Sequence, residues 1–293
     1  MLYLWLWRMR HKEEIVAREI CSRENQERVI KYLEGSEDKE RKAIYDFIKD
    51  HGLGTFPYPF SLTYDAENIE VFGSEERDEK YVLYDGKKLY FKKKWDEEEV
   101  KRYFNSLRIE QDVNSPHYYF GKGEYLPSKD DVIADIGAAE GIWALAMIER
   151  CGLVYLFESD GEWIKALKAT FAPWSDKVVI VNKFVGAEDD GENIITLDSF
   201  FADKRIDCVK ADIEGAEEDM LRGGETVFRD KVSKAVICSY HKPGDEQMIK
   251  SYLDAYGFER TETSDGYMIF GAFEEEILKP PYLSRGLVFA GRD

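Results

Sequence analysis

The feature that most constrains the fold is a short apolar run ending in a glycine-containing turn, at residues 131–143 (Asp-Val-Ile-Ala-Asp-Ile-Gly-Ala-Ala-Glu-Gly-Ile-Trp). It predicts a buried strand, a tight turn at Gly137 and Gly141, and the start of a helix. A second apolar run ends in Glu158, 23 residues after Asp135. An open α/β sheet binds a nucleoside-type ligand in the crevice above the carboxyl ends of such strands. The glycines would let the backbone approach that ligand, and Glu158 would hold both ribose hydroxyls.

Strand and helix patterns alternate from residue 129 onward, which is typical of a doubly wound sheet. Strands are expected at 132–135, 154–158, 178–182, 206–212 and 234–240, and helices at about 141–150, 161–171, 214–223 and 245–256. Segments 257–270 and 286–290 are expected to supply an antiparallel pair. We therefore expect an α/β fold over residues 129–293, with a doubly wound, mostly parallel, Rossmann-like sheet.

Residues 1–128 are expected to form an α+β extension. Apolar positions over 11–50 predict two amphipathic helices that are broken near Gly35-Ser36. Segment 80–91 predicts a hairpin with Asp85-Gly86 as its turn, and a helix is expected at about 96–112. The extension is a candidate cap that closes the crevice and selects the substrate. The alternative is an appendage that only stabilises the fold.

Charge and cysteine content limit the partners of the chain and its compartment. The 293 residues include 41 basic and 59 acidic side chains, giving a formal net charge of −18. Nucleic-acid binding needs a basic face, so no nucleic-acid partner is expected, and the Lys92-Lys93-Lys94 run is interpreted as a solvated strand end. The apolar run 1–7 is too short for a secretory signal or a membrane span. It is expected to pack internally, with contact to a membrane or partner as the alternative. Four cysteines without CxxC or zinc spacing indicate a reduced, cytoplasmic setting.

The glycine spacing distinguishes between nucleoside-type ligands. A dinucleotide turn has the pattern G-x-G-x-x-G because pyrophosphate sits at the helix N-terminus. Residues 137–141 (Gly-Ala-Ala-Glu-Gly) lack the middle glycine, and Glu140 would repel phosphate oxygens. S-adenosylmethionine fits better, with Asp135 engaging the methionine ammonium and Glu158 the ribose. The alternative is an ordinary strand-turn-helix with a surface glutamate.

A second group of charged residues ends the predicted strand 206–212. Lys210 and Asp212 lie two apart on a strand and therefore share a face. Glu214 and Glu217 follow, and both are also explained by the favourable effect of acidic side chains at a helix N-terminus. That explanation does not cover Lys210, which is costly to bury unless it pairs with a carboxylate.

His241 directly follows the predicted strand 234–240, the expected neighbour of the strand that ends at Asp212. Histidine titrates near neutral pH, so His241 is a candidate general base, with a structural role as the alternative. Asp212, Glu217 and His241 would suit an oxygen-rich metal site if they converge, although no metal is expected. His117 is a second polar candidate, from the extension.

These residues resemble the FkbM-type methyltransferases, a branch of the S-adenosylmethionine-dependent class with a Rossmann-like core. Segment 209–217 resembles the family's K-x-D-x-E-G-A-E pattern. Looser matches at 106–117, 240–241 and 267–268 indicate a bacterial subgroup. Where the family commonly has asparagine and proline, this chain has Glu140 and Ser159. The matching segments are 135–141, 157–158, 195–199 and 209–217.

The resemblance implies methyl transfer to a hydroxyl of a sugar, a glycan or a small natural product. It also implies S-adenosyl-L-methionine as cofactor. We expect His241, Asp212 and Lys210 to be catalytic. The rivals are a silent S-adenosylmethionine-binding module and a nicotinamide-dependent oxidoreductase. The residues expected at the cofactor are Asp135, Gly137, Ala138, Glu140, Gly141 and Glu158, with Glu214 and Glu217 beside them.

Overall fold

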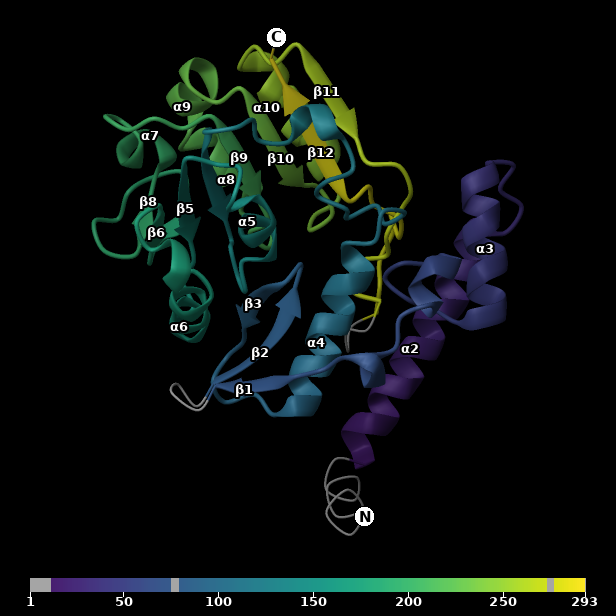
Figure 1. Ribbon diagram of the computed structural model, residues 1–293. Helices are drawn as coiled ribbons and strands as arrows, with labels where there is room; N and C mark the ends of the chain where they lie inside the picture. Colours follow the sequence, from purple (N-terminus) through teal and green to yellow (C-terminus); the bar gives the residue numbers. More distant parts are fainter. Residues whose placement is uncertain (1–11, 75–78, 273–276, 293) are drawn as a thin grey trace.

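A seven-stranded sheet is the centre of the computed structural model, which describes residues 12–74, 79–272 and 277–292 (Figure 1). The strand order is β11-β12-β10-β9-β4-β5-β6. The neighbouring strands from β10 to β6 are parallel, whereas β12 is antiparallel to both β10 and β11. The bounds are β4 (Val132–Ile136), β5 (Leu153–Phe157), β6 (Val178–Val181), β9 (Cys208–Ala211), β10 (Lys234–Cys238), β11 (Arg260–Thr263) and β12 (Leu287–Gly291). The expected doubly wound, mostly parallel α/β sheet is confirmed.

The central strands are apolar at nearly every position because both faces of the sheet are covered. All residues of β4, β9 and β12 are buried. Successive side chains point to opposite faces, so Ile133 packs in one hydrophobic cluster and Val132 and Ala134 in another. The helices of this region are α5 (Ile142–Met147), α6 (Gly161–Thr170), α7 (Leu197–Phe200), α8 (Glu217–Arg222), α9 (Glu225–Asp230) and α10 (Asp245–Ala255).

The helices that follow β9 differ from the sequence prediction in two ways. Helix α8 begins at Glu217 rather than at 214, because Glu214 and Gly215 both have a positive φ, 54° and 92°. Helix α9 was not predicted, and it begins after the Gly223-Gly224 pair. The remaining short elements are β7 (Phe184–Val185), β8 (Ile194–Ile195) and four 3-10 turns at Pro59–Leu62, Ala66–Asn68, Gly123–Tyr125 and Ala172–Trp174.

The first third of the chain is a mixed α+β region. In Figure 1, α4 stands between the α2–α3 pair and the small sheet β1-β2-β3. The hairpin is confirmed, with Asp85 and Gly86 at φ 50° and 74° in its turn. Asp96 and Glu99 form a capping box that fixes the start of α4. The bounds are α2 (Lys12–Leu33), α3 (Lys39–His51), β1 (Phe72–Ser74), β2 (Glu79–Tyr84), β3 (Lys87–Tyr90) and α4 (Glu97–Glu110).

The extension packs against the rest of the chain at several places. Ile44 and Ile48 of α3 share a hydrophobic cluster with Ile269 and Leu283, from the end of the chain. The Tyr90 N–H of β3 donates to the Thr170 hydroxyl of α6 at 3.0 Å. The segment 1–7 lies outside the described residues. No described helix is both long enough and apolar enough to cross a membrane.

Candidate functional site

The turn after β4 brings two strand ends into direct contact. Gly137 has φ 73°, and a Cβ built on it would lie 1.8 Å from the Asp212 carbonyl oxygen. Any side chain at Gly137 would therefore push β4 away from the segment after β9. Gly141, at φ 85°, begins α5 against Leu167 and Phe171. Glycine is required at both positions by the close approach as well as by the φ values.

Glu158 lies at the end of β5 and is fixed by three backbone amides. One carboxylate oxygen accepts from the Ala139 N–H at 2.8 Å, and the other accepts from Ser159 and Asp160, both at 2.7 Å. The carboxylate thus connects the β4 turn to the β5 turn. Glu158 lines a cavity of about 290 Å³, named here the Glu158 cavity, together with Gly137, Trp163, Phe184 and Glu214, among others.

Lys210 is buried and pairs with Asp135 across neighbouring strands. Its ammonium lies 2.9 Å from Asp135 Oδ1 and donates to the Gly137 carbonyl oxygen at 2.9 Å. Burial raises the pKa of the Asp135 carboxyl. Burial alone would lower the pKa of Lys210, but the Asp135 charge outweighs it and raises that pKa. The carboxylate partner that Lys210 requires is therefore Asp135 of β4, at the same register position.

A second cavity of about 270 Å³ lies beside this ion pair, and we name it the Asp135 cavity. Two buried polar atoms on its wall, Asp135 Oδ2 and Trp143 Nε1, make no hydrogen bond within the described residues. One atom is an acceptor and the other is a donor. An unpaired buried polar group costs about 1–3 kcal/mol, which indicates that a ligand satisfies them. Asp212 and Gly137 line both this cavity and the Glu158 cavity.

The extension contributes directly to the wall of the Asp135 cavity. The Tyr103 hydroxyl of α4 donates to Glu140 Oε2 at 2.8 Å, and the Ile142 N–H donates to Oε1 at 3.3 Å. Burial raises the pKa of Glu140. Glu140 is therefore held by the extension on one side and by the start of α5 on the other. Leu107 and Glu110 of α4 line the same cavity.

Asp212, the first residue after β9, is the centre of a polar cluster. The Tyr119 hydroxyl donates to Asp212 Oδ2 at 2.8 Å and the Tyr240 hydroxyl to Oδ1 at 3.2 Å. His117 Nε2 lies 3.6 Å from Oδ2. Burial would raise the pKa of Asp212, but the charges of His117 and Lys210 outweigh burial and lower the pKa to about 2. Asp212 is therefore a carboxylate at neutral pH.

His241 is held between carboxylates at both ring nitrogens. Glu217 Oε1 lies 3.0 Å from Nδ1 and also accepts the Ile213 N–H at 3.1 Å. Asp212 Oδ1 lies 3.4 Å from Nε2. Burial would lower the pKa of His241, but the Glu217 hydrogen bond and the nearby carboxylates raise it. Nε2 also lies 3.6 Å from Glu214 Oε2. A buried carboxylate on one ring nitrogen is typical of a histidine that moves protons.

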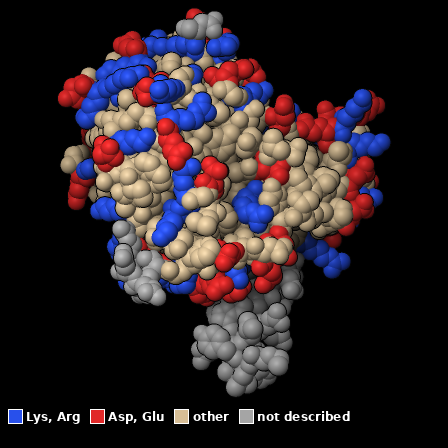
Figure 2. All heavy atoms as spheres, in the orientation of Figure 1, with Lys and Arg blue, Asp and Glu red and all other residues tan. Residues whose placement is uncertain are grey.

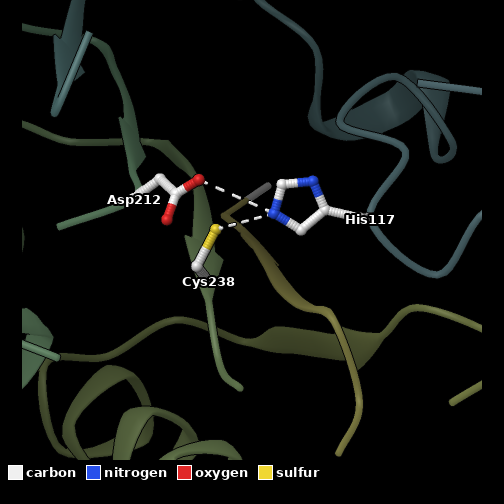
Figure 3. A group of neighbouring side chains, drawn as sticks. All are labelled: His117, Asp212 and Cys238. Atoms are coloured by element: carbon white, nitrogen blue, oxygen red, sulfur yellow. Dashed lines mark hydrogen bonds and ion pairs between the residues drawn. The ribbon is translucent and has the colours of Figure 1, made fainter. Parts of the chain in front are cut away.

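His117, Asp212 and Cys238 form the group drawn in Figure 3. His117 Nε2 lies 3.5 Å from Cys238 Sγ. Burial lowers the pKa of His117 to about 4, so the ring is neutral at pH 7. The ligand atoms of this group lie within 4.8 Å of one another, as do those of Asp212, Glu217 and His241. The convergence of Asp212, Glu217 and His241 that sequence left open is therefore observed, as proximity of their ligand atoms.

The structure places every sequence-predicted site residue at one end of the sheet, around the β4, β5, β9 and β10 termini. Sequence reasoning did not find Tyr103, Tyr119 or Trp143. Tyr103 and Tyr119 reach the site from the extension, 37 and 93 residues from the side chains they contact. Trp143 belongs to the turn segment itself. What distinguishes it is an indole N–H without a hydrogen-bond partner among the described residues, which only the structure reveals.

Residues 183–260 match the model of the methyltransferase FkbM domain. The matched segment spans less than half of the chain. It contains the 209–217 motif and His241, so the predicted resemblance is confirmed. No curated protein sequence matches the chain.

Several solved structures resemble this chain at low identity. A methyltransferase FkbM from Methylobacillus flagellatus KT is 17% identical, with a TM-score of 0.46. The similarity covers 66% of this chain but only 53% of that one. A precorrin-6y C5,15-methyltransferase from Geobacter metallireducens GS-15 is 14% identical, over 58% of this chain and 85% of that chain, with a TM-score of 0.40. M. jannaschii TYW2 in complex with AdoMet is 14% identical, over 76% and 91%, also with a TM-score of 0.40.

Proposed function

We propose that the protein transfers a methyl group from S-adenosyl-L-methionine to a hydroxyl oxygen of a sugar, glycan or small natural product. The observation that carries the proposal is the Glu217–His241 pair, which faces Asp212 beside the β4 turn. Methyl transfer to a hydroxyl releases a proton, and a histidine oriented by a carboxylate is suited to accept it. Because the family match covers only 183–260, O-methylation rests on this pair rather than on the family.

The residues of the two cavities fit this cofactor. Asp135 Oδ2 lacks a donor and suits the methionine ammonium, while Trp143 Nε1 lacks an acceptor and suits the methionine carboxylate. Glu158 suits the ribose hydroxyls, since backbone amides fix its carboxylate and the oxygen that accepts only from Ala139 retains a lone pair. Gly137, Ala138, Glu140 and Gly141 shape the turn, with Glu214 and Glu217 beside it. When bound, the cofactor supplies the methyl group on a sulfonium centre, and the protein supplies alignment and proton removal.

In this mechanism His241 removes the acceptor proton at Nε2. Glu217 orients the ring as hydrogen-bond acceptor for Nδ1–H and stabilises the imidazolium that forms. Asp212 is ionised and lies next to Nε2, where it orients the acceptor hydroxyl or His241 itself. Lys210 fixes the β4 turn through Asp135 and the Gly137 carbonyl and contributes positive potential near Asp212.

We also propose that residues 129–293 form the methyltransferase domain and that 1–128 form its cap. The Tyr103–Glu140 hydrogen bond supports this division of roles, because the cap then contacts the cofactor turn. The acceptor is proposed to be a small molecule or carbohydrate and not a nucleic acid. Figure 2 supports this, since acidic and basic side chains are interspersed over the visible face and the net charge is −18. A cytoplasmic location is proposed from the four cysteines, which are buried and have neither CxxC nor zinc spacing.

The first test is ligand binding, by thermal shift and calorimetry, with S-adenosylhomocysteine and with NAD as the control. Ligand at 100 times its Kd stabilises a fold by about 2.7 kcal/mol. We expect stabilisation by S-adenosylhomocysteine only, weakened at least tenfold in Glu158→Ala and unchanged in Glu149→Ala, an exposed glutamate outside both cavities. Preference for NAD would instead support an oxidoreductase.

The second test is turnover of methyl-labelled S-adenosylmethionine against a panel of hydroxylated acceptors. We expect His241→Ala to lose at least 100-fold in rate with S-adenosylhomocysteine binding intact, because general-base catalysis contributes about 10²–10⁴-fold. Equal turnover in the variant would exclude His241 as the base. Binding without consumption of the methyl donor across the panel would favour the silent binding module.

A further inference from the structure

Two more cavities extend the Asp135 cavity away from the β4 turn. The first, about 300 Å³ and named the Phe270 cavity, shares Glu110 and Tyr240 with the Asp135 cavity. The second, about 350 Å³ and named the Leu62 cavity, shares Thr55, Phe56 and Glu110 with the Phe270 cavity. The three cavities therefore form one row, and Glu110 lies on the wall of each.

The row changes character along its length. Its inner end is polar, because Asp135, Lys210 and Asp212 line the Asp135 cavity. Its outer end is apolar and reaches the surface at Leu62, which is 56% exposed. The apolar wall of the Leu62 cavity consists of Phe47, Leu53, Phe56, Leu62 and Ile109. A ligand that fills the row must therefore be polar at one end and apolar at the other.

Glu110 is the polar group at the junction. Among the described residues, no hydrogen bond or ion pair reaches its carboxyl group. Burial and the negative charge of Asp212 raise the pKa of Glu110 to about 8. At pH 7 the group is therefore mostly a neutral carboxylic acid, which both donates and accepts a hydrogen bond. A hydroxylated ligand satisfies both roles.

The carboxylates along the inner row also select against anions. Asp212 is ionised, and Glu140 and Glu214 line the same cavity. A phosphorylated or carboxylated acceptor head at Glu110 would lie beside these like charges. Of the described lysines and arginines, only Lys210 lines the row, and it is already paired with Asp135.

We propose that the Phe270 and Leu62 cavities form the acceptor subsite, and that the acceptor is an uncharged amphipathic molecule, with a hydroxylated head at Glu110 and an apolar tail in the Leu62 cavity. The assignment as an acceptor site rests on the proposed methyltransferase function, because the head must present its oxygen to His241. In this arrangement the cap binds the apolar tail, and the residues at the carboxyl ends of the strands contact the hydroxylated head.

The test uses octyl β-D-glucoside as probe, measured by calorimetry with the full chain, below the micelle concentration, with and without S-adenosylhomocysteine. Methyl β-D-glucoside lacks the tail and octyl phosphate has an anionic head. We expect octyl β-D-glucoside to bind at least tenfold more tightly than either. Equal affinities for the octyl and methyl glucosides would overturn the proposed tail site.

Two pairs of variants locate the binding. Ser106→Phe fills the Leu62 cavity from α4 and is expected to weaken octyl β-D-glucoside binding at least tenfold. Arg102→Phe, exposed on the same helix and outside the three cavities, should not. Glu110→Leu should weaken binding at least tenfold and Glu110→Gln less than threefold. If octyl β-D-glucoside binds unchanged in Ser106→Phe and Glu110→Leu, the subsite is wrong.

The two proposals fail separately. If S-adenosylhomocysteine binds and the glucoside does not, the methyltransferase function stands and the subsite falls. If the glucoside binds and the variants weaken its binding as predicted, but S-adenosylhomocysteine does not bind, the ligand site is supported. Its role as the methyl-acceptor site is then contradicted.

Discussion

At the scale of single residues, the Glu217–His241 pair determines when the proposed base is available. The Glu217 carboxylate favours the charged imidazolium and raises the pKa of His241. We expect Glu217→Gln to lower that pKa by about one unit or more, since an opposite charge at hydrogen-bonding distance commonly shifts a pKa by 1–3 units. The acid limb of any pH–rate profile should move to lower pH in the same variant. Both changes are checked by NMR titration of the four histidines, assigned with His241→Gln, and by turnover.

Glu218→Gln is the matched control for this experiment, because Glu218 is the next residue on α8 and is exposed. Its His241 pKa should equal that of the wild type. A Glu217→Gln protein whose His241 titrates as before would show that the carboxylate does not tune the ring, and the orienting role of Glu217 would have to be abandoned.

The raised pKa of Glu110 makes a second prediction, on stability. The pKa rises from 4.5 in the unfolded chain to about 8 in the folded one. As pH rises from 4.5 to 8 the unfolded chain therefore loses its proton first, and folding stability present below pH 4.5 is progressively lost. Glu110→Gln removes this loss. We expect the variant to gain about 1 kcal/mol or more relative to wild type between pH 5 and pH 8, since each unit of pKa shift is worth about 1.4 kcal/mol.

Urea unfolding at several pH values measures this difference. The exposed Glu188→Gln should show a stability difference from wild type that is independent of pH. A pH-independent difference for Glu110→Gln as well would mean that the Glu110 carboxyl ionises normally in the folded protein.

Much of the polar site could be predicted at the residue scale, because the motif residues follow strands whose carboxyl ends meet at one edge of the sheet. Asp135, Glu158, Asp212 and His241 all lie there. Their partners could not be predicted in the same way. Lys210 was expected to need a carboxylate, but only the register between β4 and β9 identifies it as Asp135.

At the scale of elements, the contact between the β4 turn and the end of β9 depends on Gly137. We expect Gly137→Ala to destabilise the fold by roughly 3 kcal/mol or more, because a Cβ would lie 1.8 Å from a backbone oxygen. Gly86→Ala is the control, since Gly86 has nearly the same φ, 74° against 73°, but open space around its Cβ position. That variant should lose only about 1–2 kcal/mol from backbone strain. Equal losses in urea unfolding would mean that the turn relaxes around the new methyl group.

The strands were predictable because apolar runs buried on both faces stand out from the charged helices between them. The helix boundaries were less predictable from the sequence. Glu214 and Glu217 predicted a helix that begins at 214. Because the backbone is left-handed at Glu214 and Gly215, α8 begins about one turn later. The delay places Glu217 at the first helical position, where its side chain reaches His241.

At the scale of the whole molecule, the proposed cap and domain share a hydrophobic cluster that no local pattern indicates. Apolar residues of α2 and α3 pack against Ile269, Ala272, Tyr282 and Leu283, more than 200 residues further along the chain. The hydrophobic periodicity predicted the two helices and their apolar faces, but it contains no information about which segment covers those faces. The assignment of 1–128 as a separate unit therefore concerns function rather than folding.

The shared cluster predicts that cap and domain unfold together. Ile44 of α3 is fully buried in it, and we expect Ile44→Ala to cost roughly 2–4 kcal/mol, as for other large-to-small core changes. The loss should be the same in urea unfolding followed by far-UV circular dichroism and by tryptophan fluorescence. Both proteins carry Phe at positions 5, 7 and 95, so that the fluorescence comes from the three tryptophans after residue 128, including the buried Trp143. Val113→Ala, 73% exposed in the extension, should change stability by less than about 0.5 kcal/mol. If Ile44→Ala moved only the circular dichroism transition and left the fluorescence transition in place, the extension would be an independently folding unit. The row of three cavities would then open without unfolding the seven-stranded sheet.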